Sequence, residues 1–398
     1  MTTGIDVLSL ITIKSLFDSS IHQLLHENYF LIMPEPDATF ITRDQSSPKD
    51  NTIIVKFMAK GLPRNSNDKT RYSRQLPGNK SQWGNCRFIF DAYAEKYDWL
   101  VVYHDLPRDL KSASIEKLQC PREKTILITG EPSSITVYGS YFLSQFGFII
   151  TSQEPWAIKH QNAIFTQPGL IWYYGAPRER DKKKLLTYDD IQQIAPIKKN
   201  KSISTVCSIR QGRLTLHYKR YNFTNELKAQ IPELDIYGHG VKTMNDKAEA
   251  LDAYQYHIVI ENHVYQHHLT EKLPDAFLGY TLPFYHGCPN ATDYFPRESF
   301  IPIDINNFNR TVEIIRSTLA NNEYNDRLPY IIEARRRVLE EYNLFAVLDR
   351  EISNRDGNIK TSPPGGVIMD RQTLKWRKPF YGLQREFEKV FTKIKHMR

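Results

Sequence analysis

Several patterns that define common protein classes are absent from this chain of 398 residues. Its four cysteines form no C-x-x-C pair, which suits free thiols in a reducing compartment better than a disulfide framework. No stretch reaches about 18 uninterrupted apolar residues, and the first residues do not combine a basic region with an apolar one. We therefore expect no membrane-spanning helix, no signal peptide and a cytoplasmic protein.

Common nucleotide and zinc motifs are also missing. Neither G-x-G-x-x-G nor the G-x-x-x-x-G-K-S/T loop occurs, which argues against dinucleotide oxidoreductases and P-loop NTPases. The histidine-rich stretch ENHVYQHHLTEKL, residues 261–273, lacks the H-E-x-x-H spacing of zinc helices. Its neighbours His267 and His268 would point to different sides of a helix or strand. We expect no metal site, and the tripeptide Thr270-Glu271-Lys272 becomes the part of interest.

Positive charge is concentrated near one end of the chain. The net charge is +8, and residues 375–398 contain eight basic and two acidic side chains, so they carry six of those charges. A nucleic-acid-binding protein would show a basic stripe with interleaved aromatic residues across a domain. No such stripe occurs, and we expect no nucleic acid partner.

The apolar runs predict two α/β domains. Short, continuous apolar runs between 51 and 175 suit strands of a parallel sheet that is buried on both faces, and a second series follows over 202–350. The charged segment 176–201 is predicted to connect them and to contain a short helix. An N-terminal helical extension, 1–50, precedes the domains. We expect two Rossmann-like domains that face each other across a cleft.

The last segment, 351–398, is predicted to be a basic C-terminal tail. Four apolar residues recur there at positions i, i+3, i+4 and i+7, namely Phe387, Val390, Phe391 and Ile394. Three lysines, Lys389, Lys393 and Lys395, flank this stripe. Two interpretations stay open: a helix on an anionic membrane surface, which would make the protein a peripheral membrane protein, or a helix packed across the domain interface.

Two basic residues of the second domain could bind a diphosphate. Thr270 suits the N-cap of a helix, and a helix start attracts anions, so Lys272 in its first turn would add a full charge to such a site. Arg220 lies near the start of a helix that follows a strand end, where ligands bind in open α/β sheets. The glycines of YGHG, Gly238 and Gly240, would let a nucleotide approach the backbone. The alternative is an exposed lysine on a tolerant helix.

A series of linked sequence blocks points to a family. An I-E-N block in YHIVIEN is followed by TEKL, the strand LPFYHG and the strand SFIPIDI, with RYNF, DIYGHG and, more loosely, LITGEP upstream. Their order and spacing over residues 124–345 resemble the family 10 glycosyltransferases, the α1,3/α1,4-fucosyltransferases. The resemblance implies the glycosyltransferase B fold, GDP-fucose as donor, inversion at the anomeric carbon and no metal or other cofactor. It also implies a glycan acceptor, which we expect to be lipopolysaccharide or another cell-surface glycan.

The resemblance also implies roles for individual residues. Arg220 and Lys272 are similar to the pair that neutralises the donor diphosphate, and Asn262 and Glu271 resemble residues that contact ribose or the donor sugar. Glu131, in TGEP, resembles the catalytic base, which would take the proton of the acceptor hydroxyl. Its alternative role is a strand-end acid that solvates a turn.

Three further positions concern the donor site. Glu261 is expected to hold the loop in shape. His268 replaces a usual aromatic residue but can still contact the donor, and His239 replaces a residue that is more often basic. These two departures leave two alternatives open: a relative that uses a different GDP-sugar, and a non-catalytic protein that binds nucleotides or glycans.

Overall fold

The computed structural model describes residues 52–62, 70–108, 113–169, 171–209 and 216–397. The predicted N-terminal helical extension, 1–50, lies outside these residues. None of the helices within the described ranges is long and apolar enough to cross a membrane.

The first domain is built on a seven-stranded sheet in the order β2-β3-β1-β4-β6-β7-β8. Its strands are β1 (Ile53–Ala59), β2 (Gln82–Trp83), β3 (Cys86–Ile89), β4 (Trp99–Tyr103), β6 (Thr125–Ile128), β7 (Phe148–Thr151) and β8 (Ala163–Phe165). All pairs are parallel except β2 with β3. The prediction that the apolar runs between 51 and 175 form strands of a mainly parallel sheet is confirmed.

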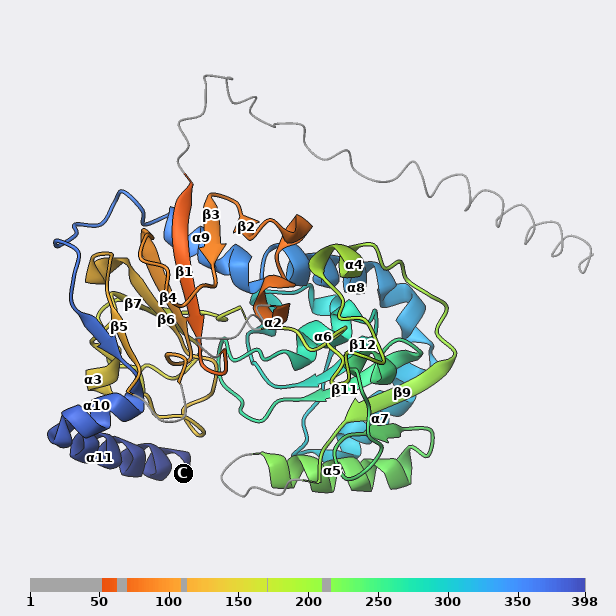
Figure 1. The fold of residues 1–398 in the computed structure, drawn as a ribbon. Coiled ribbons are helices and arrows are strands. Elements are labelled where there is room, and N and C mark those ends of the chain that lie inside the picture. Colours follow the sequence, from red (N-terminus) through yellow and green to blue (C-terminus); the bar gives the residue numbers. More distant parts are fainter. Residues whose placement is uncertain (1–51, 63–69, 109–112, 170, 210–215, 398) are drawn as a thin grey trace, which may run out of the picture. The chain divides into compact units, whose positions relative to one another are not determined.

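Successive residues of the central strands alternate between two apolar cores, because strand side chains point to opposite faces. In β4, Val101 contributes to one core and Leu100 to the other. The helix α9 (Leu344–Ser353) covers the first face, and α3 (Ser140–Leu143), α10 (Arg371–Arg377) and α11 (Pro379–His396) cover the second. Figure 1 shows α10 and α11 on the other side of the sheet from α9.

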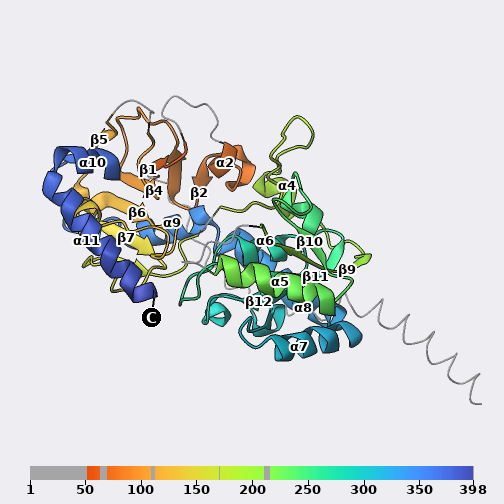
Figure 2. The same ribbon diagram turned by 90° about the horizontal axis from the view of Figure 1, so that it is seen from below.

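The second domain is built on a five-stranded parallel sheet in the order β10-β9-β11-β12-β13. Its strands are β9 (Lys201–Val206), β10 (Asp235–Tyr237), β11 (Tyr254–Ile260), β12 (Leu282–His286) and β13 (Ile301–Pro302). Its helices are α5 (His217–Gln230), α6 (Lys272–Leu278), α7 (Phe308–Ala320) and α8 (Glu323–Glu340). Figure 2, seen from below, shows α5 and α7 beside this sheet. The predicted α/β fold with two Rossmann-like domains is confirmed.

The connection between the sheets contains the expected short helix, α4 (Tyr188–Gln192). Thr187 and Asp190 cap its start reciprocally, each side chain bonding the other residue's backbone N–H. The small helix α2 (Thr70–Ser73) belongs to the first half of the chain. Gly169 lies early in the connection with a positive φ of 64°.

The chain returns from the second domain to the first at Asn343. The helix α8 ends at Glu340 and α9 begins at Leu344. The Asn343 side chain accepts a hydrogen bond from Phe345 N at 2.9 Å, and its amide donates to Gln75 O at 2.9 Å. Leu348 and other apolar residues of α9 then join the first core. The structure therefore moves the end of the second domain from residue 350 to about this asparagine.

The segment 351–398 is part of the first domain as far as it is described. Its strand β14 (Val367–Met369) pairs antiparallel with β5 (Ile115–Lys117). On α11, Tyr381 is buried and the Glu388 carboxylate accepts a hydrogen bond from Ser140 Oγ at 2.7 Å. The predicted apolar stripe faces outward, with Phe387 70% and Ile394 51% exposed. The helix is thus packed on one face and apolar on the open one.

Candidate active site between the two sheets

The carboxyl ends of three neighbouring strands of the first sheet meet at one cavity. Lys60 follows β1, His104 follows β4 and Glu131 comes soon after β6, and the three line a cavity of about 320 Å³. Ligands of open α/β sheets bind at this edge. The other side of the cavity is formed by residues of the second domain, namely Asn262, His268, Thr270, Glu271 and Lys272.

A second cavity, of about 490 Å³, lies at the strand ends of the second sheet. Arg220, Gly238 and His239 contribute to its lining, together with Asn262, Glu271 and Lys272. The last three residues line both cavities, so the two spaces meet at these side chains. A ligand that filled the second cavity could present one end toward Glu131.

Lys272 is held at this junction by two carboxylates. Its Nζ lies 3.0 Å from Glu261 Oε2 and 3.5 Å from Glu271 Oε1. Burial alone would lower the pKa of Lys272, but Glu261 and Glu271 outweigh it and raise the pKa, so the ammonium stays charged. The unfavourable position of a cation at the first residue of α6 is therefore offset by the chain's own carboxylates.

Glu261 fixes the loop that carries the site. Its side chain is fully buried and accepts hydrogen bonds from Thr270 N at 3.0 Å and from Thr270 Oγ1 at 2.6 Å. The expected structural role of Glu261 is confirmed. Thr270 is not the N-cap: α6 begins at Lys272 with Glu271 as the N-cap, because the Thr270 hydroxyl is directed to Glu261.

Lys247 is a site residue that sequence reasoning missed. Its Nζ lies 2.7 Å from Asp275 Oδ2 and 3.7 Å from Glu271 Oε1. Burial would raise the pKa of Glu271, but Lys272 and Lys247 outweigh it and hold this pKa at about 2. Glu271 is therefore an ionised acceptor at the junction. Lys247 begins a single-turn 3₁₀ helix (Lys247–Ala250) between β10 and β11, which is too short for a periodic pattern to mark it.

Arg220 reaches the same junction from α5. Its Nη1 donates to Asn262 Oδ1 at 2.8 Å, and its buried Nε has no hydrogen-bond partner among the described residues. A buried donor without a partner costs about 1–3 kcal/mol, which a ligand oxygen could offset. The structure thus brings Arg220, Asn262, Glu271 and Lys272 together around one cavity.

The two glycines of YGHG differ in position. Gly238 lines the second cavity, and a Cβ there would lie 2.2 Å from Cys207 O, so a close approach of β9 and β10 requires the glycine. Gly240 is not part of that lining; a Cβ on it would meet Ile209 at 2.6 Å. Only the first glycine is placed beside the cavity.

The Glu131 carboxylate is exposed to the first cavity. Among the described residues it has no hydrogen-bond partner, while its backbone O accepts from Gln153 Nε2 at 2.6 Å. Desolvation in the cavity and the charge of Glu271 raise the pKa of Glu131, opposed by the cations Lys272 and Lys60. A free carboxylate with a raised pKa suits proton transfer. Lys60 was also missed, although its position after a strand end could have marked it.

His268 is buried between the two domains. Its Nδ1 lies 3.1 Å from Ser152 Oγ of the first domain. Burial lowers the pKa of His268 to about 4, helped by His263 and Lys272, so the imidazole is neutral at pH 7. It can offer a hydrogen bond or a ring face to a ligand, but no charge.

One group of side chains in the described part of the chain could hold a metal ion, namely Glu154, His263 and His396, whose ligand atoms lie within 4.8 Å of one another. These atoms already have partners within the protein. His263 Nε2 lies 3.1 Å from Glu154 Oε1, and Ser133 Oγ lies 2.6 Å from Glu154 Oε2 and 2.7 Å from His396 Nε2. The group is therefore a hydrogen-bonded contact between three parts of the chain. Glu154 lies in the loop after β7, His263 in the second domain and His396 on α11.

Comparisons with known proteins agree with the blocks of the second domain. Residues 196–327 match the family model "Glycosyltransferase family 10 (fucosyltransferase) C-term". The α-(1,3)-fucosyltransferase FucT of Helicobacter pylori is 32% identical over 93 residues, which are 23% of this chain and only 19% of that protein.

Solved structures that resemble the chain include an α1,3-fucosyltransferase with GDP-fucose, with 16% identity and a TM-score of 0.42 over 75% of this chain and 93% of the other. A glycosyltransferase of Rickettsia africae matches at 12% identity, with a TM-score of 0.40 over 76% of this chain and 98% of the other. Residues 196–327 are therefore similar to the C-terminal part of glycosyltransferase family 10, and the chain spans about a fifth of the length of its Helicobacter relative.

Proposed function

We propose that this protein is an inverting, metal-independent glycosyltransferase that moves fucose from GDP-fucose to a hydroxyl of a glycan. One observation carries the proposal: Asn262, Glu271 and Lys272 line both the cavity that contains Arg220 and the cavity that contains Glu131. A donor bound with its nucleotide in the second cavity would have its sugar near the carboxylate of the first.

The donor diphosphate would lie beside Lys272 and Arg220. Fixed cations stabilise a leaving phosphate without Mg²⁺, because they are already in place when negative charge develops. Lys272 would exchange part of its contact with Glu261 for phosphate oxygens, and the unpartnered Arg220 Nε would gain an acceptor. Glu271 and Asn262 provide acceptors and a donor for sugar hydroxyls.

The chemical step is a single displacement. The acceptor oxygen forms a bond to the anomeric carbon as the bond from that carbon to the GDP oxygen breaks, and the acceptor proton passes to Glu131. GDP leaves with the electron pair of the broken bond. The raised pKa of Glu131 makes it a stronger base than an ordinary carboxylate.

The identity of the sugar rests on the family. The Helicobacter relative is an α-(1,3)-fucosyltransferase, and the matched family is described by that activity. His268 offers a neutral ring at the cavity. A different GDP-sugar is the alternative, and it would be identified by the donor that binds most tightly.

We place the enzyme in the cytoplasm, at the surface of a membrane that carries a lipid-linked or lipopolysaccharide-type acceptor. The four buried free thiols support a reducing compartment, and the outward apolar stripe of α11 supports a membrane surface. Binding to vesicles, compared between the unaltered chain and a Phe387→Ser variant, tests this location.

Calorimetric titration with GDP and GDP-fucose in the presence of EDTA tests the donor site. We expect saturable binding without a metal, weakened about tenfold or more in Lys272→Ala, because a charge-assisted contact is lost. Lys184→Ala, which removes an exposed lysine of the connection, is the matched control and should bind normally.

Lys272→Arg separates loss of charge from loss of folding, because it keeps a cation beside Glu261. Thermal unfolding of each variant shows whether the fold persists. If the unaltered protein bound no nucleoside diphosphate, the proposal that it is a glycosyltransferase would be wrong. If it bound another nucleoside diphosphate in place of GDP, only the assignment of fucose as the donor sugar would be wrong.

A further inference from the structure

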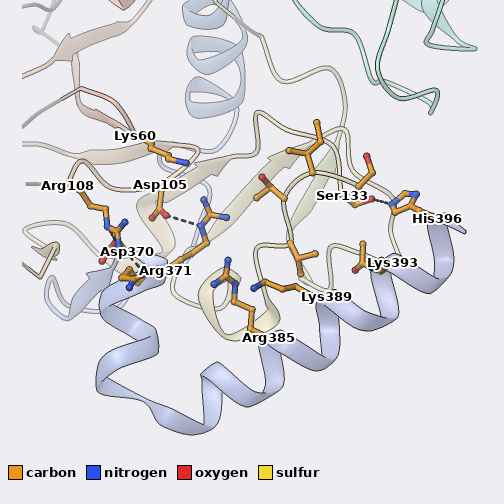
Figure 3. A pocket seen from close by; sticks show the side chains of 16 residues that line it. Lys60, Asp105, Arg108, Ser133, Asp370, Arg371, Arg385, Lys389, Lys393 and His396 are labelled. Atoms are coloured by element: carbon orange, nitrogen blue, oxygen red, sulfur yellow. Dashed lines mark hydrogen bonds and ion pairs between the residues drawn. The ribbon is translucent and has the colours of Figure 1, made fainter. Parts of the chain in front are cut away.

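A third cavity, lined by basic residues, adjoins the cavity that contains Glu131. It has a volume of about 420 Å³, within the range of ligand pockets, and lies between α11 and the first domain. Lys60 and Ile135 line both this cavity and the Glu131 cavity, and Ser133 to Thr136, shortly after Glu131 in the chain, form one wall. Figure 3 shows Lys60 and the basic residues of α11 on different sides of the space. We refer to it as the α11 cavity.

The lining of the α11 cavity is strongly positive. It contains six cations, Lys60, Arg108, Arg371, Arg385, Lys389 and Lys393, and two carboxylates, Asp105 and Asp370, for a net charge of +4. Both carboxylates are engaged: Asp105 lies 2.9 Å from Arg371 Nε, and Asp370 lies 2.6 Å from Arg108 Nε.

Three of the remaining cations have no acidic partner. Within the described part of the chain, no carboxylate lies within 4 Å of the charged nitrogens of Lys60, Arg385 or Lys393, whereas Lys389 pairs with the exposed Glu386 at 2.7 Å. A concentration of unpaired cations around a concave space favours an anionic ligand. The positive charge of these three side chains is therefore available to an anionic ligand.

Two buried polar atoms in the same lining also lack partners. Ser134 Oγ and Arg385 Nε are buried, and neither has a hydrogen-bond partner among the described residues. Such groups are uncommon in folded proteins because each loses its hydration without compensation. An anion in the cavity would accept hydrogen bonds from both, and arginine suits phosphate, sulfate and carboxylate oxygens in particular.

The sequence of α11 directs these residues inward. Arg385, Lys389 and Lys393 are spaced by four and so share one face of the helix. The apolar residues Leu383, Phe387, Val390, Ile394 and Met397 share another and are exposed. Two of the three lysines beside the apolar stripe thus line a cavity, which a helix built only for an anionic membrane would not need.

We propose that the α11 cavity is an acceptor subsite that binds an anionic substituent, a phosphate, sulfate or carboxylate, of the glycan whose hydroxyl reaches Glu131. This inference rests on the proposed function and adds the chemical class of the acceptor: a negatively charged glycan. Lys60, which lines both cavities, would lie between the anion and the reacting hydroxyl.

The test uses glucose 6-phosphate as probe and glucose as its neutral match, titrated into the full chain with GDP saturating, so that the donor site is occupied. We expect the phosphate ester to bind and glucose not to bind. An Arg385→Gln/Lys393→Gln variant should weaken the phosphate ester about tenfold or more. Lys395→Gln is the matched control, because Lys395 is on α11 but outside the lining, and should change binding less than twofold.

Three outcomes would overturn the inference. They are absence of glucose 6-phosphate binding, binding that the double variant leaves unchanged, and equal turnover of neutral glycans and their sulfated, phosphorylated or carboxylated counterparts in a transfer assay with GDP-fucose. GDP binding, measured on the same samples, reports separately on the proposed function.

Vesicles separate a glycan anion from a lipid headgroup. Phosphatidylcholine vesicles with and without phosphatidylglycerol are compared for the unaltered chain and the double variant. If the double variant loses binding to the anionic vesicles while glucose 6-phosphate never binds, the cavity serves a lipid headgroup and the acceptor assignment is wrong. An Arg385→Lys variant keeps the positive charge at this position. If it binds the phosphate ester while the double variant does not, α11 remains packed on the first domain.

Discussion

Lys272 Nζ lies 3.0 Å from Glu261 Oε2, and this carboxylate is fully buried. The pair joins the start of α6 to the end of β11, so the buried Glu261 carboxylate positions the ammonium that we propose for the donor diphosphate. Replacing Glu261 by Gln should remove the ion pair and lower the free energy of unfolding by about 1–3 kcal/mol. Urea unfolding measures the change.

The same variant distinguishes positioning from binding. Glu261→Gln keeps Lys272, so GDP affinity should fall less than it does in Lys272→Ala. Equal losses in the two variants would mean that Lys272 contributes only through its structural pair.

Glu131→Gln should abolish most turnover and leave donor binding intact. An amide cannot take the acceptor proton, and general-base catalysis contributes roughly 10²- to 10⁴-fold. The kcat of transfer should fall by about that factor while the dissociation constant of GDP-fucose stays within twofold. Unchanged kcat would show that another group is the base.

The pH dependence of transfer should report the raised pKa of Glu131. The base acts when it is ionised. The value of kcat/KM should therefore be highest above this pKa and should decrease as pH falls through it. Lys60 lowers the pKa of Glu131, so Lys60→Met should raise it and move the acid limb of the pH profile to higher pH. A limb that stays in place would mean that Glu131 does not control it.

Buried neutral histidines should make the fold sensitive to mild acid. Burial lowers the pKa of His268 to about 4 and that of His257 to about 3, below the ordinary 6.5. The unfolded chain therefore takes up protons below pH 6.5 that the folded chain cannot bind, so stability is lost as pH falls. At pH 5 each histidine should cost about 2 kcal/mol relative to pH 7. Urea unfolding at both values measures this, and His268→Gln should have a shallower dependence.

Asn343→Ala should destabilise the junction of α8 and α9. The alanine removes the cap on Phe345 N and the bond to Gln75 O in a fully buried position. Loss of a cap and a buried hydrogen bond should lower the free energy of unfolding by about 1–3 kcal/mol. Asn354→Ala, at the other end of α9, is the control and should have less effect, because its side chain caps no described helix start.

Local patterns predicted the sheets well because buried parallel strands carry continuous apolar runs, as in Ile53–Ala59 and Trp99–Tyr103. The break at Asn343 was missed since the apolar spacing continues through it. Only tertiary contact with Gln75 shows that the chain changes domain there.

The site was predicted in part for a similar reason. Arg220 was placed after a strand end and Lys272 in the first turn of a helix, and the resemblance assigned both to one ligand. Lys247 and Lys60 carry no motif, and their relevance comes from charges that are distant in sequence, Asp275 and Glu131. The inward face of α11 was not predicted, because periodicity shows that a helix is amphipathic but not which face is covered.

The return of the chain at Asn343 has a consequence for motion. The outward connection passes Gly169, whose Cβ, if present, would lie 2.8 Å from Leu344 Cα. The two covalent links between the sheets therefore touch at one place. Contact at one place favours rotation of one domain against the other over sliding, so we expect the space around Glu131 to widen by rotation about a hinge near Gly169 and Leu344.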